Sequence, residues 1–414
     1  MHKGLSRPKN QIRFLLLEGI SPSAVEVLRA AGYDNVEVLP KALDQTALIA
    51  ALKDVQMLGI RSRTQITEAV VASAPSVVAV GCFSVGTNQV ELEAARRRGV
   101  PVFNAPFSNT RSVAELTIAE IVMLLRGAFA KSMAAHQGRW IKSADGSREI
   151  RGKTLGIVGY GNIGTQLAVL AEAMGMRVIY HDRTDKLRHG NVEPADSLDD
   201  LLARSDVVSL HLPETPETRG MFGAAQLRGM KPGGFLINNA RGSLVDIDAL
   251  AAALRDGHLG GAAVDVFPSE PKSNADAFES PLRGLDNVIL TPHVGGSTEE
   301  AQERIGDEVA RKLVEYSDVG STVGAVNFPQ VQLPKGGTVT RFIQVQRNAP
   351  GELGKLNDLF ARHRLNIAAQ HYQTDGEIGY VVLDAEGPVE GAFDILTEIR
   401  ALPGTIRARL LNRA

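Results

Sequence analysis

Three side chains with complementary acid–base chemistry lie in the second half of the chain: Arg241, Glu270 and His293. Each sits in a polar loop directly after a predicted strand, and these loops span 239–242, 265–271 and 291–296. An imidazole can accept a hydroxyl proton, a neighbouring carboxylate can orient that imidazole and raise its pKa, and a guanidinium can hold a carboxylate bidentately. Hydride transfer at a carbinol carbon needs this set. We therefore expect His293 to be the general base, Glu270 its partner and Arg241 the substrate anchor.

A glycine-rich segment earlier in the chain predicts a dinucleotide site. The apolar run 154–158 is followed by Gly159, Gly161 and Gly164, and a helical pattern then covers 165–174. The first glycine allows a tight turn, the second lets the backbone approach a pyrophosphate, and the third lets helix and strand pack closely. The helix N-terminus offers free N–H groups to the phosphates.

The nature of the dinucleotide is predicted by an acidic residue after the next strand. The strand expected at 177–180 leads to Asp182, which lies at the distance from the glycines that suits a ribose 2′-hydroxyl. Arg183 follows and would accommodate a 2′-phosphate, but Asp182 would repel that phosphate. The predicted cofactor is therefore NAD rather than NADP.

Composition and charge exclude several other classes of function. The chain has 414 residues, too many for one core, and its net charge of −2 gives no reason to expect binding to nucleic acid or to membranes. The single cysteine, Cys82, excludes an intrachain disulfide, and no spacing of His, Asp and Glu suggests a metal site. The apolar run 12–17 is too short for a signal peptide. We expect a soluble, cytoplasmic protein of two or three domains.

Alternating apolar runs and helical patterns predict a parallel α/β domain in the N-terminal part of the chain. Strands are expected at 12–17, 57–60, 77–80 and 100–103, and helices at 23–31 and 89–98. Ligands bind beyond the carboxyl ends of the strands in such sheets. Arg61 and Arg63 follow one of those ends.

A second, doubly wound parallel sheet is predicted around the glycine segment. Residues 112–115 have the form of a capping box that opens a long helix to about Lys131. Further strands are expected at 206–210, 235–238, 262–266 and 288–290, and a helix over 298–316 leads back to the first domain. The expected fold class is α/β with two Rossmann-like domains. The cofactor domain (108–296) is inserted in a discontinuous substrate domain (1–107 and 297–335).

The pattern changes after a segment rich in proline and glycine, 328–337, which predicts a linker. Beyond it, strand and helix patterns follow in the order β-α-β-β-α-β, which is the order of a ferredoxin-like domain over 336–414. The strands are expected at 338–346, 367–373, 379–384 and 406–411, and the first helix at 351–364. At about 80 residues, this domain is large enough to fold alone.

Together with the loops around Arg241, Glu270 and His293, the glycine segment resembles the D-2-hydroxyacid dehydrogenase family. The likeness extends to 59–64, 81–88, 104–115, 267–271 and 406–409 and covers nearly the whole chain, including a C-terminal ACT domain of the bacterial type. It implies NAD-dependent oxidation of 3-phospho-D-glycerate to 3-phosphohydroxypyruvate, the first step of the phosphorylated pathway of serine biosynthesis, by a homotetramer. Some members also reduce 2-oxoglutarate to 2-hydroxyglutarate, and this side activity stays open.

The resemblance also implies roles for individual residues. Arg241, Glu270 and His293 match the catalytic positions. The NAD-contacting positions are Gly159, Gly161, Asn162, Ile163, Gly164, Asp182, Asn239, Ala240, Arg241, Asp265, His293, Val294, Gly295 and Gly296. The substrate phosphate needs its own cations, for which Arg61 and Arg63 are the best candidates. The substrate positions are completed by Ser62, Asn109 and Lys142, the last of which would reach a neighbouring subunit.

The ACT domain implies a small amino acid as an allosteric effector, with L-serine as the expected inhibitor. Such ligands bind at strand–loop–helix junctions between subunits, and Asn348 and Asn366 match the ligand positions. Gln346 stands where inhibited members carry a histidine. Because a glutamine can hydrogen-bond a hydroxyl or carboxylate but carries no positive charge, weaker serine binding is expected.

Two other functions stay open. One is another D-2-hydroxyacid dehydrogenase, such as a hydroxypyruvate or glyoxylate reductase. The other is an NAD-sensing regulatory protein on the same fold, which can keep Arg241, Glu270 and His293. The ACT domain argues against the regulatory protein, and a turnover assay separates the two classes.

Overall fold

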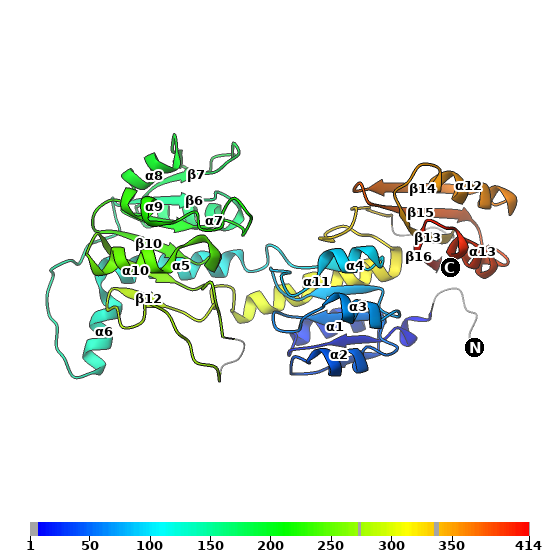
Figure 1. The fold of residues 1–414 in the computed structure, drawn as a ribbon, viewed down its shortest axis with the longest axis horizontal. Helices are drawn as coiled ribbons and strands as arrows, with labels where there is room; N and C mark the ends of the chain where they lie inside the picture. The colour runs from blue at the N-terminus through cyan, green and yellow to red at the C-terminus, as the bar shows by residue number, and fades with distance from the viewer. Residues whose placement is uncertain (1–6, 272–274, 335–338, 414) are drawn as a thin grey trace. The chain divides into compact units, whose positions relative to one another are not determined.

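The computed structural model describes residues 7–271, 275–334 and 339–413. The chain forms two compact units, one made of Met1–Ser108 with Gln302–Ala414 and the other of Asn109–Ala301 (Figure 1). Within the described ranges, no helix is both long and apolar enough to cross a membrane.

The second unit is built on a seven-stranded parallel sheet with the order β12-β11-β10-β9-β6-β7-β8. Its strands are β6 (Thr154–Val158), β7 (Arg177–His181), β8 (Glu193–Pro194), β9 (Val207–Leu210), β10 (Gly234–Asn238), β11 (Leu259–Val264) and β12 (Val288–Leu290). The direction of the strand order reverses at β6 and β9. This reversal is the switch point of a doubly wound fold, beside which ligands bind.

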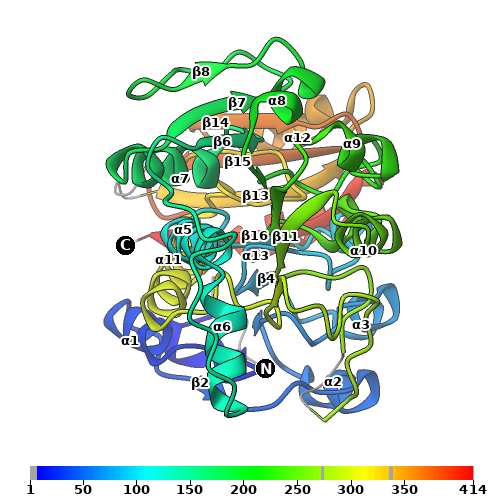
Figure 2. The ribbon, with the colours of Figure 1, turned by 90° about the vertical axis from the view of Figure 1, so that its left-hand side faces the viewer.

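Helices cover both faces of this sheet (Figure 2). One face packs against α5 (Thr110–Arg126) and α7 (Asn162–Ala173), and the other against α8 (Leu198–Arg204), α9 (Ala224–Gly229) and α10 (Ile247–Arg255). Phe235 and Ile237 point to the first group of helices, and Leu236, between them, points to the second. The strands are therefore apolar on both faces, which is why they appear as continuous apolar runs.

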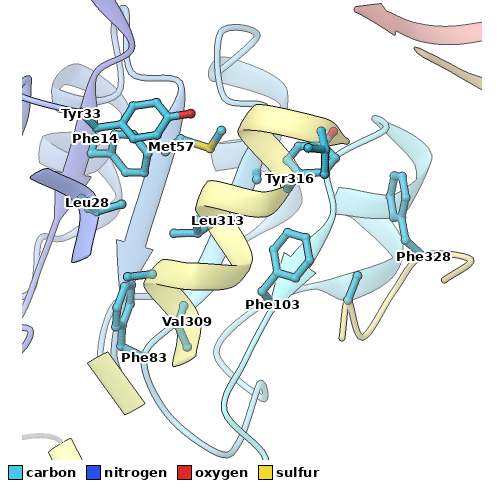
Figure 3. Close-up of a cluster of buried hydrophobic side chains, with 14 of the residues drawn as sticks. Phe14, Leu28, Tyr33, Met57, Phe83, Phe103, Val309, Leu313, Tyr316 and Phe328 are labelled. Atoms are coloured by element: carbon cyan, nitrogen blue, oxygen red, sulfur yellow. The ribbon is translucent and has the colours of Figure 1, made fainter. Parts of the chain in front are cut away.

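The first unit holds a five-stranded parallel sheet with the order β2-β1-β3-β4-β5. Its strands are β1 (Phe14–Leu16), β2 (Val36–Val38), β3 (Met57–Ile60), β4 (Ala79–Cys82) and β5 (Val102–Phe103). One face packs on α2 (Gln45–Ala51), α3 (Glu68–Ser73) and α4 (Leu92–Arg97), and the other on α1 (Pro22–Ala30) and α11 (Glu299–Val319). Figure 3 shows Val309, Leu313 and Tyr316 of α11 among the aromatic side chains of this core. The chain thus returns to its first sheet after the second, as predicted.

The C-terminal part of the first unit has the predicted ferredoxin-like topology. It consists of β13 (Val339–Arg347), α12 (Glu352–Arg362), β14 (Ile367–Thr374), β15 (Ile378–Glu386), α13 (Ala392–Ala401) and β16 (Thr405–Arg413). The sheet is antiparallel with the order β14-β15-β13-β16. Phe342, Val381 and Leu410 pack on the two helices from one face of the sheet.

The other face of this antiparallel sheet packs onto the end of α11. Arg341 is fully buried, and its Nε and Nη2 each donate to a carboxylate oxygen of Asp384 at 2.6 Å. Its Nη1 donates to the carbonyl of Val319 at 2.8 Å, and the hydroxyl of Tyr380 donates to the carbonyl of Gly320 at 2.6 Å. Within this unit, the C-terminal domain is therefore attached to the end of α11 by buried polar contacts.

The predicted linker, 328–337, lies between α11 and β13, and its described part, 328–334, contains no helix or strand. Phe328, Val331 and Leu333 of this segment are buried in the core of the first unit. Its Gly-Gly pair, 336–337, lies outside the described residues. Burial of these three apolar side chains holds the described part of the segment against the first unit.

The predicted capping box at Ser112 was wrong. The α5 helix begins at Thr110, and the hydroxyl of Ser112 lies 2.9 Å from the hydroxyl of Thr298 instead of capping the helix. The helix ends at Arg126 rather than near Lys131, because Gly127 adopts a left-handed conformation (φ 56°). A separate helix, α6 (Ala128–His136), follows.

Candidate active site

Arg241, Glu270 and His293 lie beyond the carboxyl ends of β10, β11 and β12, three neighbouring strands of the second unit. The structure brings the three side chains to one edge of the sheet. Glu270 and His293 are hydrogen-bonded, and the positive charge of Arg241 acts on both. The parallel sheet therefore gathers groups that are far apart in the sequence.

The contact between Glu270 and His293 is direct. Nδ1 of His293 lies 2.9 Å from Oε2 and 3.1 Å from Oε1 of Glu270, and Oε1 also accepts the backbone N–H of Phe267 at 3.1 Å. A proton on Nδ1 satisfies this carboxylate, so the geometry assigns the neutral tautomer in which Nε2 is the acceptor. The His293 side chain is 53% exposed, which leaves Nε2 accessible to a substrate.

Each of the two residues shifts the pKa of the other. The hydrogen bond to Glu270 is the largest influence on His293 and raises its pKa, against the opposing effects of burial and of the Arg241 charge. Burial alone would raise the pKa of Glu270, but its bonds to His293 and to the Phe267 N–H, with the charge of Arg241, hold it below the usual value. Glu270 therefore stays ionised and makes His293 a stronger base.

The turn that carries His293 is held by a buried carboxylate. His293 adopts a left-handed backbone conformation (φ 55°), which is rare outside glycine, and its N–H donates to the carbonyl of Asp265 at 2.8 Å. The carboxylate of Asp265, 1% exposed, accepts the N–H groups of Val294 and Gly295, each at 2.8 Å, and the hydroxyl of Thr291 at 2.6 Å. This positioning role of Asp265 was not predicted. Its contact with NAD stays a prediction.

A second buried carboxylate, missed by the sequence interpretation, lies next to the Arg241 loop. Nδ2 of Asn239 donates to Oε2 of Glu120 at 2.7 Å and to the hydroxyl of Thr117 at 3.0 Å, both on α5. Glu120 is 2% exposed. Burial raises the pKa of Glu120 to about 7 against the hydrogen bond from Asn239, and the charge of Asp265 adds to the rise. The available signal was a lone acid inside the most apolar helical stretch of the chain.

The glycine segment fits a dinucleotide phosphate. Gly159 has φ 95°, and a side chain there would collide with the carbonyl of His211. A side chain at Gly164 would collide with the carbonyl of Gly159, whereas one at Gly161 would meet nothing within 4 Å. Gly161 therefore borders open space at the N-terminus of α7, where Asn162 and Ile163 form the first turn. Free N–H groups and accessible backbone are what a pyrophosphate requires.

Asp182 follows β7 with its carboxylate already ordered. Its oxygens accept the N–H of Tyr160 at 3.0 Å and the N–H and hydroxyl of Thr184 at 3.1 Å, and Lys186 lies 3.7 Å away. Burial would raise the pKa of Asp182, but these hydrogen bonds and the charge of Lys186 outweigh it and hold the pKa low. An ionised acid at this position suits a ribose hydroxyl and repels a 2′-phosphate.

The remaining predicted cofactor residues line the same edge of the sheet. Ala240 is buried, Val294 is 38% exposed, and a side chain at Gly296 would collide with the amide of Asn109. Asn109, predicted to bind substrate, thus lies against the turn that carries His293. Lys142 is exposed in the loop after α6.

The predicted phosphate ligands of the first unit follow β3. Ser62 and Arg63 are exposed, and Arg61 is half-buried. The backbone of this loop is bonded to the carboxylate of Glu18, a residue the sequence did not single out. That Arg61, Arg63 and Lys142 bind one phosphate stays a prediction.

The predicted effector residues differ in exposure. Asn348 is exposed; its N–H and Nδ2 donate to the carbonyls of Glu377 and Gly376 at 2.9 and 3.2 Å, and Tyr372 donates to its Oδ1 at 3.0 Å. Asn366 is also exposed. Gln346 is 1% exposed, and its buried Oε1 has no hydrogen-bond partner within the described part of the chain.

Comparison with known proteins shows which families of proteins this chain is similar to. Residues 118–295 match the family described as "D-isomer specific 2-hydroxyacid dehydrogenase, NAD binding domain", and residues 342–407 match the "AHAS small subunit-like ACT domain". The D-3-phosphoglycerate dehydrogenase of Escherichia coli (strain K12) is 55% identical over 407 residues, which cover 98% of this chain and 99% of that protein. The enzyme of the same name from Dictyostelium discoideum is 45% identical, with 98% of each chain covered.

Solved structures share the fold over about three quarters of the chain. The TT0316 protein from Thermus thermophilus is 35% identical and aligns with a TM-score of 0.68, covering 76% of this chain and 100% of that one. D-Lactate dehydrogenase from Aquifex aeolicus, determined in complex with NAD and lactic acid, is 27% identical with a TM-score of 0.66, covering 77% and 100%.

Proposed function

Because the chain belongs to the D-3-phosphoglycerate dehydrogenase family, we propose that it catalyses the NAD-dependent oxidation of 3-phospho-D-glycerate to 3-phosphohydroxypyruvate. The observation that carries this proposal is the 55% identity across 98% of the chain. The hydrogen-bonded pair of Glu270 and His293 beside Arg241 supplies the chemistry that the reaction needs. The reaction is the first step of serine biosynthesis by the phosphorylated pathway.

The proposed mechanism assigns one task to each side chain. The glycine segment and Asp182 would hold NAD, which would supply the acceptor for the hydride at C2 of the hydroxy acid. Nε2 of His293 takes the proton of the C2 hydroxyl, and Glu270 stabilises the imidazolium that forms. Arg241 holds the substrate carboxylate bidentately and polarises the C2 oxygen. In the reverse direction, protonated His293 returns the proton.

The phosphate of the substrate is proposed to bind Arg61 and Arg63, with Lys142 as a further candidate. A phosphate carries charge and three acceptor oxygens, for which guanidinium groups are well suited. A hydroxypyruvate or glyoxylate reductase has no such ligand to neutralise, so these two arginines favour the phosphorylated acid over that alternative.

We further propose L-serine as an inhibitory effector that binds near Gln346, Asn348 and Asn366. Oε1 of Gln346 supports this site, because a buried polar atom without a hydrogen-bond partner is costly and a donor group of the ligand would satisfy it.

The homotetramer, the cytoplasmic location and 2-oxoglutarate reduction stay predictions.

Contacts lead from the predicted effector site to the first parallel sheet within the same unit. Asn348 is bonded to the turn between β14 and β15 through the carbonyl of Glu377. The carboxylates of Glu377 and Asp375 in that turn bind Arg96 of α4, with 3.2 Å between Nη1 of Arg96 and Oδ2 of Asp375. Arg96 also binds Glu93 at 3.0 Å, and its side chain is only 15% exposed. We propose that this contact couples the effector to the substrate domain.

The activity is tested by following NADH oxidation with 3-phosphohydroxypyruvate, hydroxypyruvate, glyoxylate and 2-oxoglutarate in parallel, with and without L-serine. We expect the highest kcat/KM with 3-phosphohydroxypyruvate, little activity with NADPH, and inhibition by serine. Higher kcat/KM with hydroxypyruvate or glyoxylate would identify another hydroxyacid dehydrogenase. No turnover with any of the four acids would favour the NAD-sensing alternative.

A further inference from the structure

Glu18 lies in a strained turn directly after the first strand of the chain. β1 ends at Leu16, and both Glu18 and Gly19 adopt left-handed backbone conformations, with φ values of 65° and 61°. A left-handed conformation is unfavourable for a residue with a Cβ, and it persists where surrounding contacts enforce it. Glu18 is therefore held in place by interactions other than its own backbone preference.

Those interactions are hydrogen bonds to the loop that carries Arg61 and Arg63. Oε1 of Glu18 accepts the backbone N–H groups of Arg61 at 3.2 Å and of Thr64 at 2.8 Å, and Oε2 accepts the N–H of Arg63 at 3.0 Å. In addition, Nη1 of Arg61 donates to the carbonyl of Glu18 at 3.4 Å. One carboxylate thus orders three of the four residues in this loop, by charge-assisted bonds that are stronger than neutral ones.

The loop is also held from its carbonyl side. Nε2 of Gln89 donates to the carbonyl of Arg61 at 2.6 Å and to the hydroxyl of Ser84 at 3.1 Å. Three backbone N–H groups and one carbonyl of the loop are therefore bonded within the unit. Hydrogen bonds to both its N–H groups and its carbonyl restrict the backbone of this loop to one conformation. The side chains of Arg61 and Arg63 therefore extend from fixed backbone positions.

We propose that Glu18 is a positioning residue for the substrate phosphate, an inference that rests on the proposed function. Its carboxylate holds the backbone of residues 61–64 so that Arg61 and Arg63 meet the phosphate together. In this proposal Glu18 does not contact the substrate, because both of its carboxylate oxygens accept N–H groups of the loop. A carboxylate in direct contact with the phosphate would weaken substrate binding by charge repulsion. Its effect is expected on phosphorylated substrates only, because the phosphate is the group that these arginines bind.

The first test is Glu18→Gln, which keeps the shape but replaces one acceptor oxygen with an N–H₂ group. Because both carboxylate oxygens of Glu18 accept hydrogen bonds from the loop, at least one backbone N–H of the loop would then face the N–H₂ group of the glutamine, which is also a donor. We expect KM for 3-phosphohydroxypyruvate to rise about tenfold, with kcat, KM for NADH and KM for hydroxypyruvate changed by less than about twofold. Glu26→Gln, an exposed glutamate on α1, is the matched control and should leave all four constants unchanged. Equal increases of KM for both acids would overturn the proposal, because they would indicate a general defect of the fold.

The second test asks whether Glu18 acts through the arginines. Glu18→Gln is compared in the parent and in the Arg61→Ala/Arg63→Ala background, and we expect it to raise KM less than about twofold in the latter. A full tenfold effect without the arginines would overturn the proposal. If Glu18→Gln does not fold, Glu18→Asp replaces it: the shorter side chain withdraws both oxygens from the loop, and the same selective rise in KM is expected. Unchanged constants in Glu18→Asp would then overturn the proposal.

The phosphate site at Arg61 and Arg63 and the positioning role of Glu18 can be tested separately. If Arg61→Ala/Arg63→Ala leaves KM for 3-phosphohydroxypyruvate unchanged, the assignment of the phosphate site is wrong and the role of Glu18 falls with it. If the arginine variants raise that KM selectively and the Glu18 variants do not, only the role of Glu18 is wrong.

Discussion

Nδ1 of His293 lies 2.9 Å from Oε2 of Glu270, although 23 positions separate the two residues in the sequence. They meet because β11 and β12 are parallel neighbours, so the loops after both strands emerge at the same edge of the sheet. The bond orients the imidazole, raises its pKa and leaves Nε2 as the acceptor for a substrate proton. The predictions on catalysis follow from this pair.

His293→Ala is expected to lower kcat by about 10²- to 10⁴-fold, because this is the usual contribution of a general base. Steady-state turnover with 3-phosphohydroxypyruvate measures this constant. His363→Ala, in the ACT domain and bonded to Glu398, is a control that should retain kcat. A His293→Ala variant with near-normal kcat would contradict the proposed mechanism.

Glu270→Gln should shift the pH dependence to lower pH in both directions of the reaction. The Glu270 charge raises the pKa of His293, so removing it lowers that pKa. Reduction needs protonated His293, and its kcat/KM should fall at a lower pH than in the parent. Oxidation needs neutral His293, and its kcat/KM should rise at a lower pH. Profiles in both directions test this, and unchanged midpoints would show that Glu270 does not set the pKa.

Glu120→Gln should stabilise the protein at alkaline pH. In the folded protein the pKa of Glu120 is about 7, above the usual value of 4.5. The contribution of the protonated carboxyl to the free energy of unfolding is therefore fully present below pH 4.5 and is lost as the pH rises to 7. The stability gain of Glu120→Gln over the parent should grow across that window and level off at about 3 kcal/mol. Thermal unfolding across the window measures it. Glu115→Gln, exposed on the same helix, should show no such trend, and a pH-independent difference for Glu120→Gln would contradict the assignment.

Asn348→Ala should relieve inhibition by L-serine while activity without serine is preserved. Inhibition should weaken because the variant lacks a side chain that is proposed to hydrogen-bond the effector. Activity should be preserved because Asn348 is not part of the loops that carry Arg241, Glu270 and His293. Inhibition curves at fixed 3-phosphohydroxypyruvate measure the change, which we expect to be about tenfold in the half-inhibitory concentration. If serine has no effect on the parent enzyme, the regulatory proposal is wrong.

Arg96→Ala should weaken inhibition while serine still binds. Arg96 connects α4 with Asp375 and Glu377, so its loss should reduce the coupling between effector and active site by about three- to tenfold. Calorimetry reports serine binding, and inhibition curves report coupling. Arg97→Ala, whose side chain is exposed and whose partner is Glu68, is the adjacent control. Equal losses of binding and inhibition would place Arg96 in the ligand site instead.

The sequence by itself determined the architecture and the candidates for the reacting groups. Apolar runs separated by helical patterns predict parallel sheets, because strands buried on both faces need continuous apolar sequence. The rule that ligands bind beyond the carboxyl ends of parallel strands then singled out Arg241, Glu270 and His293 without a structure. The glycine spacing and Asp182 predicted where the cofactor binds, because the conformation of the glycines and the charge of the acid are local features of the sequence.

Only the tertiary structure decided which carboxylates hold the loops in place. Nothing in the sequence marks Glu18, Asp265 and Glu120 as groups that hold loops, yet each is bonded to a loop or side chain that lies between 26 and 119 positions away. The burial of Gln346 was decided in the same way. Burial and hydrogen-bond partners depend on how elements distant in the sequence pack, and residue type alone does not specify that packing.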